Sequence, residues 1–318
     1  MRRTLFAGLL ILIFAGVGRA QLRVELLLEQ KQYLINESLH IGVRLVNHTG
    51  QTLNITGTNW LSFTVEDTEG YFVRRVRDTP APEPFEVEST YMATQWIDIH
   101  RAFAFRENAS YSLRARVRIE QWNEDIYSNP VKFEIIRGTK LWEQRFGLPG
   151  SGQPNQPEIR KYILQQANYL DELQLYVRVT DESENYVFKV QRLAPMVQVS
   201  RPEAQIDTLM QLHVLTQVGR SQFLHLVVDP DANMILRNTY EGTSRQRPQL
   251  RVSPSGSVFV AGGVRQLRRD DLPPSPIFTR PLPEPPPSEE GAKDADDAGS
   301  NDTPELTVPP DASTPDGR

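Results

Sequence analysis

Alternating apolar and polar residues run through the first half of this chain, and this pattern restricts that half to β structure. Every second residue is apolar in segments 39–45, 61–65, 111–119 and 131–135. Side chains of a strand point to opposite faces in turn, whereas a helix repeats every 3.6 residues. About seven or eight short strands between residues 22 and 137, without a helical period, predict an all-β fold that begins with an antiparallel sandwich.

Three segments of this region carry a resemblance to a known family. Asn36–Ser38 precedes an alternating strand that ends at Val46–Gly50, and Glu107–Leu113 turns into a late strand. This order resembles the immunoglobulin-like modules of bacterial secreted proteins, which include macroglobulin-type and BsuPI-type sandwiches. The likeness covers about a third of the chain. It implies an Ig-like fold for residues 21–137, with Tyr111 placed to form a tyrosine corner, and it implies no functional residue.

The second half of the chain contains a repeat. A proline motif recurs at intervals of 45 and 46 residues, and an apolar segment follows each copy. The prolines are Pro157, Pro202 and Pro248, and the apolar segments are 173–179, 212–215 and 258–260. Hairpin turns are expected at 180–182 and 228–230. A period of about 45 residues with four strands per unit is typical of propeller blades, but three units are too few to close a propeller. We expect either an open propeller-like array or a second sandwich.

Both ends of the chain differ in composition from the β regions. A basic start at Arg2 and Arg3, an apolar run from Leu5 to Phe14 and a small residue at Ala20 predict a secretory signal peptide. The tail is rich in proline and carries three basic and ten acidic residues, which predicts disorder. The predicted layout is a signal peptide (1–20), a sandwich (21–137), a linker with a first strand (138–158), a repeat-built domain (159–270) and a tail (271–318).

Composition excludes several classes of partner and site. Cysteine is absent, so disulfides, thiol nucleophiles and Cys-based metal sites are excluded. The whole chain has a net charge of −5 and the tail accounts for −7, which leaves a body near neutrality once the leader arginines are removed. That balance predicts no nucleic-acid binding. No second apolar run reaches the roughly 20 residues of a membrane span. We expect export by the general secretory route to the periplasm or the extracellular space.

The histidines are the first candidates for chemistry. His213 and His225 flank a turn at Gly219 and Arg220. A two-residue turn would put the two imidazoles on opposite faces of the hairpin, and a three-residue loop would bring them opposite each other. Two histidines alone do not make a zinc site. We therefore predict no metal and no cofactor.

Other motifs are also weak. Asp229, Asp231 and Asn233 match the start of a calcium loop, but Met234 and Tyr240 replace its essential glycine and glutamate, so a hairpin turn is the better interpretation. No nucleophile elbow, phosphate loop or dinucleotide motif is present. Facing carboxylates could still hide a hydrolase, but we expect no enzyme and no catalytic residue.

One surface feature is a candidate for binding. Arg114, Arg116 and Arg118 form a stripe on the outer face of one strand, which could hold an anionic glycan or an acidic segment. The alternative is a solvated face paired with acids on neighbouring strands. The sequence favours a binding protein with a protein or glycan partner in the bacterial envelope. An envelope hydrolase or protease inhibitor, a structural component of an assembly, and a homo-oligomer joined through sheet edges remain open.

Overall fold

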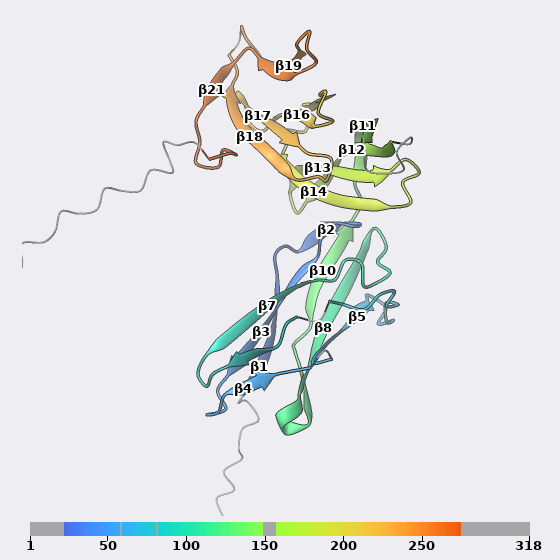
Figure 1. Ribbon diagram of the computed structural model, residues 1–318, viewed down its shortest axis with the longest axis vertical. Coiled ribbons are helices and arrows are strands. Elements are labelled where there is room, and N and C mark those ends of the chain that lie inside the picture. The colour runs from blue at the N-terminus through green and yellow to red at the C-terminus, as the bar shows by residue number, and fades with distance from the viewer. Residues whose placement is uncertain (1–21, 58, 81, 149–156, 244, 275–318) are drawn as a thin grey trace, which may run out of the picture. The chain divides into compact units, whose positions relative to one another are not determined.

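The computed structural model describes residues 22–57, 59–80, 82–148, 157–243 and 245–274 (Figure 1). Regular structure in these residues is β strand apart from one 3₁₀ turn, η1 (Glu120–Trp122). The all-β fold class with several antiparallel sheets is therefore confirmed. The expected signal peptide and the tail from residue 275 onward lie outside the described residues.

Two sheets and a ribbon form the first region. A three-stranded sheet has the order β1–β3–β7, a five-stranded sheet has the order β2–β10–β8–β5 with β9 beside β8, and β4 pairs with β6. Strands β2 and β10 are parallel, and the other pairs are antiparallel. The strands are β1 (Leu22–Leu28), β2 (Gln32–Leu34), β3 (His40–Asn47), β4 (Leu53–Ile55), β5 (Leu61–Asp67), β6 (Phe85–Val87), β7 (Met92–Asp98), β8 (Ala109–Ile119), β9 (Glu124–Tyr127) and β10 (Val131–Ile136).

The apolar residues of the alternating segments meet in one core between these sheets. Ile41 and Leu45 of β3 and Leu113 and Val117 of β8 are fully buried members of it. Trp60 closes the core with its ring edge-on to Phe85, at a centroid distance of 5.4 Å. Burial of this apolar face is the main stabilising contribution of a sandwich.

The predicted tyrosine corner is present. The Tyr111 hydroxyl accepts a hydrogen bond from the Arg106 backbone N–H at 2.8 Å and donates to the Arg106 carbonyl at 3.4 Å. This bond reaches five residues upstream and ties the loop before β8 to the core.

The described residues of the first region contain ten strands, β1 to β10, where seven or eight were expected, and the four alternating segments are all among them. Segments 39–45, 61–65, 111–119 and 131–135 lie within β3, β5, β8 and β10, apart from one residue at Leu39. Residues 71–73, which follow the turn at Gly70, do not form a strand, because only Phe72 among them makes a bridge, an isolated one to Glu66.

Three further sheets form the second region. The first has the order β11–β12–β13–β14, the second has the order β15–β16–β17–β18–β21, and the third is the ribbon β19–β20. The strands are β11 (Thr139–Leu148), β12 (Glu158–Tyr169), β13 (Glu172–Asp181), β14 (Val187–Pro195), β15 (Glu203–Ile206), β16 (Leu212–Gln217), β17 (Gln222–Val228), β18 (Met234–Glu241), β19 (Gln249–Val252), β20 (Val258–Ala261) and β21 (Val264–Gln266).

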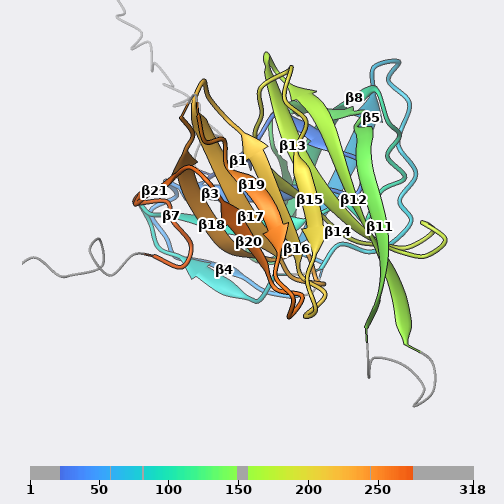
Figure 2. The same ribbon diagram turned by 90° about the horizontal axis from the view of Figure 1, so that it is seen from above.

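The first two of these sheets pack face to face. Tyr162 and Val177 of the first sheet share a buried cluster with Val214 and Leu226 of the second, and Figure 2 shows the two sheets side by side. The ribbon lies on the other face of the second sheet, since β19 is in contact with β15 and β16. The region is thus a stack of successive antiparallel sheets.

The proline motifs of the predicted repeat coincide with the starts of strands. Pro157, Pro202 and Pro248 each stand immediately before a strand, namely β12, β15 and β19, and the apolar segments lie in β13, β16 and β20. The hairpin turns expected after Thr180 and Val228 are also present. Four strands per unit, however, holds only for β15–β18. The first sheet begins with β11, before its motif, and the third has two strands because β21 joins the second sheet.

Candidate functional site

The arginine stripe lies on the outer face of β8, as predicted. Arg116 donates to the Ser62 hydroxyl at 3.0 Å and forms an ion pair with Asp125 at 3.2 Å. Arg118 pairs with the same carboxylate at 3.4 Å, whereas Arg114 stands opposite Thr64 of β5. A neighbouring strand, β9, therefore supplies an acid to two of the three cations, which lowers the positive charge that the stripe offers to a partner.

A second group of arginines lies in an exposed segment that sequence reasoning did not identify as a site. We call Tyr71–Arg77 the aromatic–arginine segment. Its two aromatic rings are among the most exposed large apolar side chains described, at 67% for Tyr71 and 73% for Phe72. Arg74, Arg75 and Arg77 are also exposed.

Backbone hydrogen bonds hold this segment in place at both ends. The Val73 N–H donates to the Val65 carbonyl at 2.9 Å, and the Val76 N–H donates to the Ala102 carbonyl at 2.8 Å. The segment is thus an extended strip fastened first to β5 and then to the chain before β8. Exposed side chains on a fastened backbone lose less entropy on binding than those on a free loop.

The three arginines of the segment are in different environments. The Arg75 guanidinium lies 5.9 Å from the centroid of the Phe103 ring, donates to the Phe63 carbonyl at 3.4 Å and approaches Asp78 at 3.9 Å. Within the described residues, the side chains of Arg74 and Arg77 make no ion pair. These two cations are available to an anionic partner, while Arg75 helps to fasten the strip.

The signal for this segment was present in the sequence. Two aromatic residues and three arginines fall within seven positions, and tyrosine and arginine are enriched at binding hot spots. A segment of this kind after a turn, here one that ends in Gly70 with a φ of +84°, is typical of a return strand. Among the described residues, the segment makes only isolated β-bridges, from Phe72 to Glu66 and from Arg75 to Phe103. Its side chains therefore stay in solvent, which the sequence alone does not show.

The two histidines of the second region meet, in contrast to the prediction from a two-residue turn. The Val218 N–H donates to the Gln222 carbonyl at 3.0 Å, so the loop between them has three residues. In the resulting register His213 stands opposite Val227, and His225 stands opposite Leu215. The imidazoles are therefore diagonal neighbours on one face, neither directly opposite nor on different faces.

These histidines form a buried chain with an aspartate. His213 Nδ1 lies 3.1 Å from His225 Nε2, and His213 Nε2 lies 3.2 Å from Asp207 Oδ2. Both imidazoles are buried, and the rings stack at 24°. Burial lowers the pKa of His225 to about 4, with added repulsion from His213 and from Arg265. His225 is therefore neutral at pH 7.

The chain Asp207–His213–His225 lies on the face of the second sheet that the ribbon covers. The Leu250 N–H in β19 donates to Glu203 at 2.8 Å, and Arg247 stacks on the Phe223 ring at 5.2 Å from that face. The three groups run in a line and do not surround a common point. Among the described residues, no group of three or more His, Asp or Glu could hold a metal ion.

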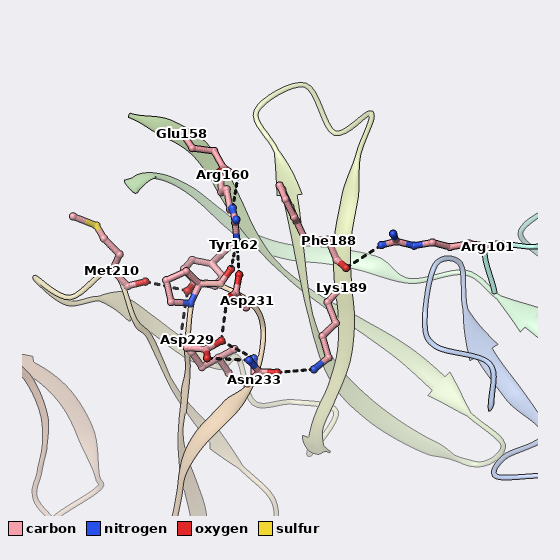
Figure 3. Close-up of polar contacts among 12 residues, drawn as sticks. Arg101, Glu158, Arg160, Tyr162, Phe188, Lys189, Met210, Asp229, Asp231 and Asn233 are labelled. Carbon is pink, nitrogen blue, oxygen red and sulfur yellow. Dashed lines mark hydrogen bonds and ion pairs between the residues drawn. The ribbon is translucent and has the colours of Figure 1, made fainter. Parts of the chain in front are cut away.

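The calcium-like motif is a hairpin turn, as predicted. Asp229 Oδ1 accepts hydrogen bonds from the backbone N–H groups of Asp231 and Asn233, at 3.0 and 2.8 Å. Lys189 donates to the Asn233 side chain at 2.9 Å. The oxygens that a calcium ion would need are therefore bound within the protein (Figure 3).

Figure 3 shows how Arg160 of β12 clamps this turn. Arg160 forms ion pairs with Glu158 at 2.6 Å and with Asp231 at 2.8 Å, and donates to the Pro230 carbonyl at 3.0 Å. Its guanidinium also lies 4.0 Å from the centroid of the Phe188 ring. One cation thus joins the β17–β18 turn to the first sheet, which is a structural role.

The described residues contain no helix that is long and apolar enough to cross a membrane.

Comparisons with known proteins assign no family. No protein-family model matches the chain, and no curated protein matches its sequence. Among solved structures, the crystal structure of Spo0M, a sporulation control protein from Bacillus subtilis, matches at 8% identity. The match covers 56% of this chain and 91% of that chain, with a TM-score of 0.27. This is a distant structural similarity that says nothing about activity.

Proposed function

We propose that this protein is exported and acts without catalysis, as a binding protein that recognises an acidic glycan of the bacterial envelope. The aromatic–arginine segment is the binding surface. The observation that carries this proposal is the exposure of Tyr71 and Phe72 beside Arg74 and Arg77 on a backbone that is hydrogen-bonded at both ends.

The exposed rings of Tyr71 and Phe72 do not contribute to the stability of the fold, because an apolar side chain stabilises a protein only when it is removed from water. A partner that covers these rings would gain that free energy on binding. Arginine pairs with carboxylates through two parallel hydrogen bonds, and aromatic rings offer rigid contact area. The combination suits a partner that carries both flat apolar faces and negative charges.

The shape of the segment favours a glycan over a protein. Seven extended residues span about 20 Å at roughly 3.3 Å per residue, which matches a few sugar units in line. A stable protein interface usually buries about 800 Å² on each side, and a single strip is narrow for that. An acidic polysaccharide presents ring faces and carboxylates along one axis, as the strip presents rings and guanidinium groups.

The predicted family resemblance fits this role. We propose that residues 21–137 are an Ig-like module of the macroglobulin or BsuPI type. The two-sheet core and the Tyr111 corner support this assignment. Such a sandwich is a rigid scaffold that carries binding residues on its loops. The predicted signal peptide supports export.

Titration with oligogalacturonate, a carboxylate-bearing glycan, tests the proposal. Isothermal calorimetry of residues 21–318 should show binding at low salt, and none to neutral dextran. The variant Arg74→Gln/Arg77→Gln should weaken binding about tenfold or more, since hot-spot side chains each contribute more than 1 kcal/mol. The variant Tyr71→Ala/Phe72→Ala should weaken it similarly.

The arginine stripe provides a matched control. Arg114→Gln/Arg118→Gln removes the same charge from the same domain and should leave the affinity within about threefold. If this variant loses binding and the segment variant keeps it, the stripe is the site and the proposal is wrong. If poly-glutamate binds and oligogalacturonate does not, the partner is an acidic polypeptide.

A further inference from the structure

Strand β7 is the outer strand of its sheet (Figure 1), and its sequence lacks the features that normally guard such an edge. In the described residues it pairs with β3 alone. Edge strands usually carry lysine, proline or inward charges that prevent further pairing. Two other edge strands of this molecule follow that rule, since β11 carries Lys140 and Arg145 and β14 carries Lys189 and Arg192. From Met92 to Ile97, β7 has no charge and no proline.

The free edge also displays large apolar side chains. Met92 is 64% exposed and Trp96 is 51% exposed, and both lie on the outer face of the sheet with Thr94 between them. Trp96 stands opposite Gly42 of β3. A Cβ at Gly42 would lie 3.1 Å from the Trp96 ring, so glycine there leaves room for the indole to lie across the sheet.

The hydrogen-bond register shows which backbone groups of β7 face outward. The Asn47 N–H donates to the Tyr91 carbonyl, and the Ile99 N–H donates to the Leu39 carbonyl. Odd-numbered residues of β7 therefore bond to β3. Hydrogen-bonded pairs alternate along an antiparallel ladder, so the N–H and C=O groups of the even-numbered residues point away from the sheet. These belong to Met92, Thr94 and Trp96.

We infer that β7 pairs with β7 of a second copy of this chain, antiparallel and centred on Thr94. In this register Thr94 meets its own counterpart, and Met92 of each copy lies opposite Trp96 of the other. All the outward backbone groups then fall in hydrogen-bonded pairs. The two apolar pairs lie on one face, and Asp98 falls outside the paired core. A two-fold interface must be self-complementary, and the sequence Met-Ala-Thr-Gln-Trp meets that condition about its centre.

Arg44 of β3 stands opposite Thr94, at the centre of the proposed pairing, and its side chain is held by contacts within its own copy. Its Nε donates to the Thr94 hydroxyl at 3.4 Å, and its guanidinium lies 3.7 Å from Glu25. Its charge is offset in part within its own copy, because Glu25 also pairs with Arg23 at 3.0 Å. The dimer goes beyond the proposed glycan binding and uses none of the residues of the aromatic–arginine segment, so either proposal can fail without the other.

Sedimentation velocity of residues 21–318 over a concentration series tests the pairing. The chain should form a dimer. Thr94→Lys puts two ammonium groups face to face at the centre, which should raise the dimer dissociation constant about tenfold or more. Thr64→Lys, the same change on strand β5, should leave the dimer intact. A chain that is monomeric at every concentration, or a Thr94→Lys variant that dimerises as well as the parent, overturns the inference.

A cysteine variant tests the register without adding charge. The chain has no cysteine, so Thr94→Cys introduces a single thiol. Directly opposed residues in a hydrogen-bonded antiparallel pair have Cα atoms about 5.5 Å apart, within the range of a disulfide. Mild oxidation should cross-link Thr94→Cys into a covalent dimer and leave Thr64→Cys monomeric on a denaturing gel. A dimer in solution that Thr94→Cys does not cross-link places the interface elsewhere and overturns the inference.

Discussion

Single residues in this molecule fall into two groups: those whose polar atoms bind other residues of the chain, and those whose side chains are exposed to solvent. Tyr111, His225 and Arg160 are all largely buried, and each has a polar atom bound by another residue. Arg74 and Tyr71 are exposed and fastened only through their backbone. The first group stabilises the fold, and the second is available to a partner.

The Tyr111 hydroxyl is expected to contribute to stability through its bond to the Arg106 backbone. Tyr111→Phe removes the acceptor and leaves that N–H without its protein partner. The free energy of unfolding should fall by about 1–1.5 kcal/mol in urea denaturation. Tyr127→Phe, at a ring that is 58% exposed, should change it by less than about 0.5 kcal/mol. Equal effects of the two changes would contradict a tyrosine corner.

His225 should make the protein less stable in acid. Its pKa is about 4 in the fold, against 6.5 for a free histidine. The unfolded chain therefore takes up this proton first, and stability is lost as pH falls from about 6.5 to about 4. The loss should approach 3 kcal/mol, at 1.36 kcal/mol per pKa unit.

His225→Gln tests this directly, because glutamine can still bond to His213 and does not titrate. The difference between the free energies of unfolding at pH 7 and pH 4.5 should shrink by about 2–3 kcal/mol relative to the parent. His48→Gln, at an exposed position, should leave that difference in place. An unchanged pH profile for His225→Gln would show that the buried pair does not control acid stability.

At the scale of elements, strand alternation predicted the first region well, and loop length limited what could be predicted about the second. Strands β3, β5, β8 and β10 follow from periodicity because one face of each is buried. For the histidine hairpin the sequence left two loop lengths open; the structure has the three-residue loop, with the imidazoles as diagonal neighbours and not directly opposite each other. A shift of one residue moves every side chain of a strand to the other face. Nothing in the local sequence distinguishes the two loop lengths.

The Arg160 clamp is an element-scale contact that a pattern search does not find, since its partners lie 70 and 71 residues away. Arg160→Met should lower the free energy of unfolding by about 2 kcal/mol, which allows for the solvent around Asp231. Arg145→Met breaks an ion pair whose partners are 67% and 50% exposed and should cost less than about 0.5 kcal/mol. Thermal or urea unfolding compares the two. Similar losses would mean that Arg160 is not a clamp.

At the scale of the whole molecule, the prolines at intervals of 45 and 46 residues marked where new strands begin, but they did not determine how many strands each sheet holds. Strand β21 completes the second sheet instead of the third, and β11 adds to the first. Such exchanges depend on which edge is left open after folding, and that is not encoded locally. The exposure of the aromatic–arginine segment could not be predicted for a related reason, because alternation does not show whether a segment has one neighbour or two.

Arginine-specific labelling with phenylglyoxal, read by mass spectrometry, tests the proposed function most directly. Residues 21–318 are labelled with and without oligogalacturonate, and modification is followed at Arg74, Arg77 and Arg114. If the aromatic–arginine segment binds the glycan, modification of Arg74 and Arg77 falls in its presence while Arg114 is labelled as before. Protection of Arg114 alone, or of none of the three at saturating glycan, would contradict the proposed function.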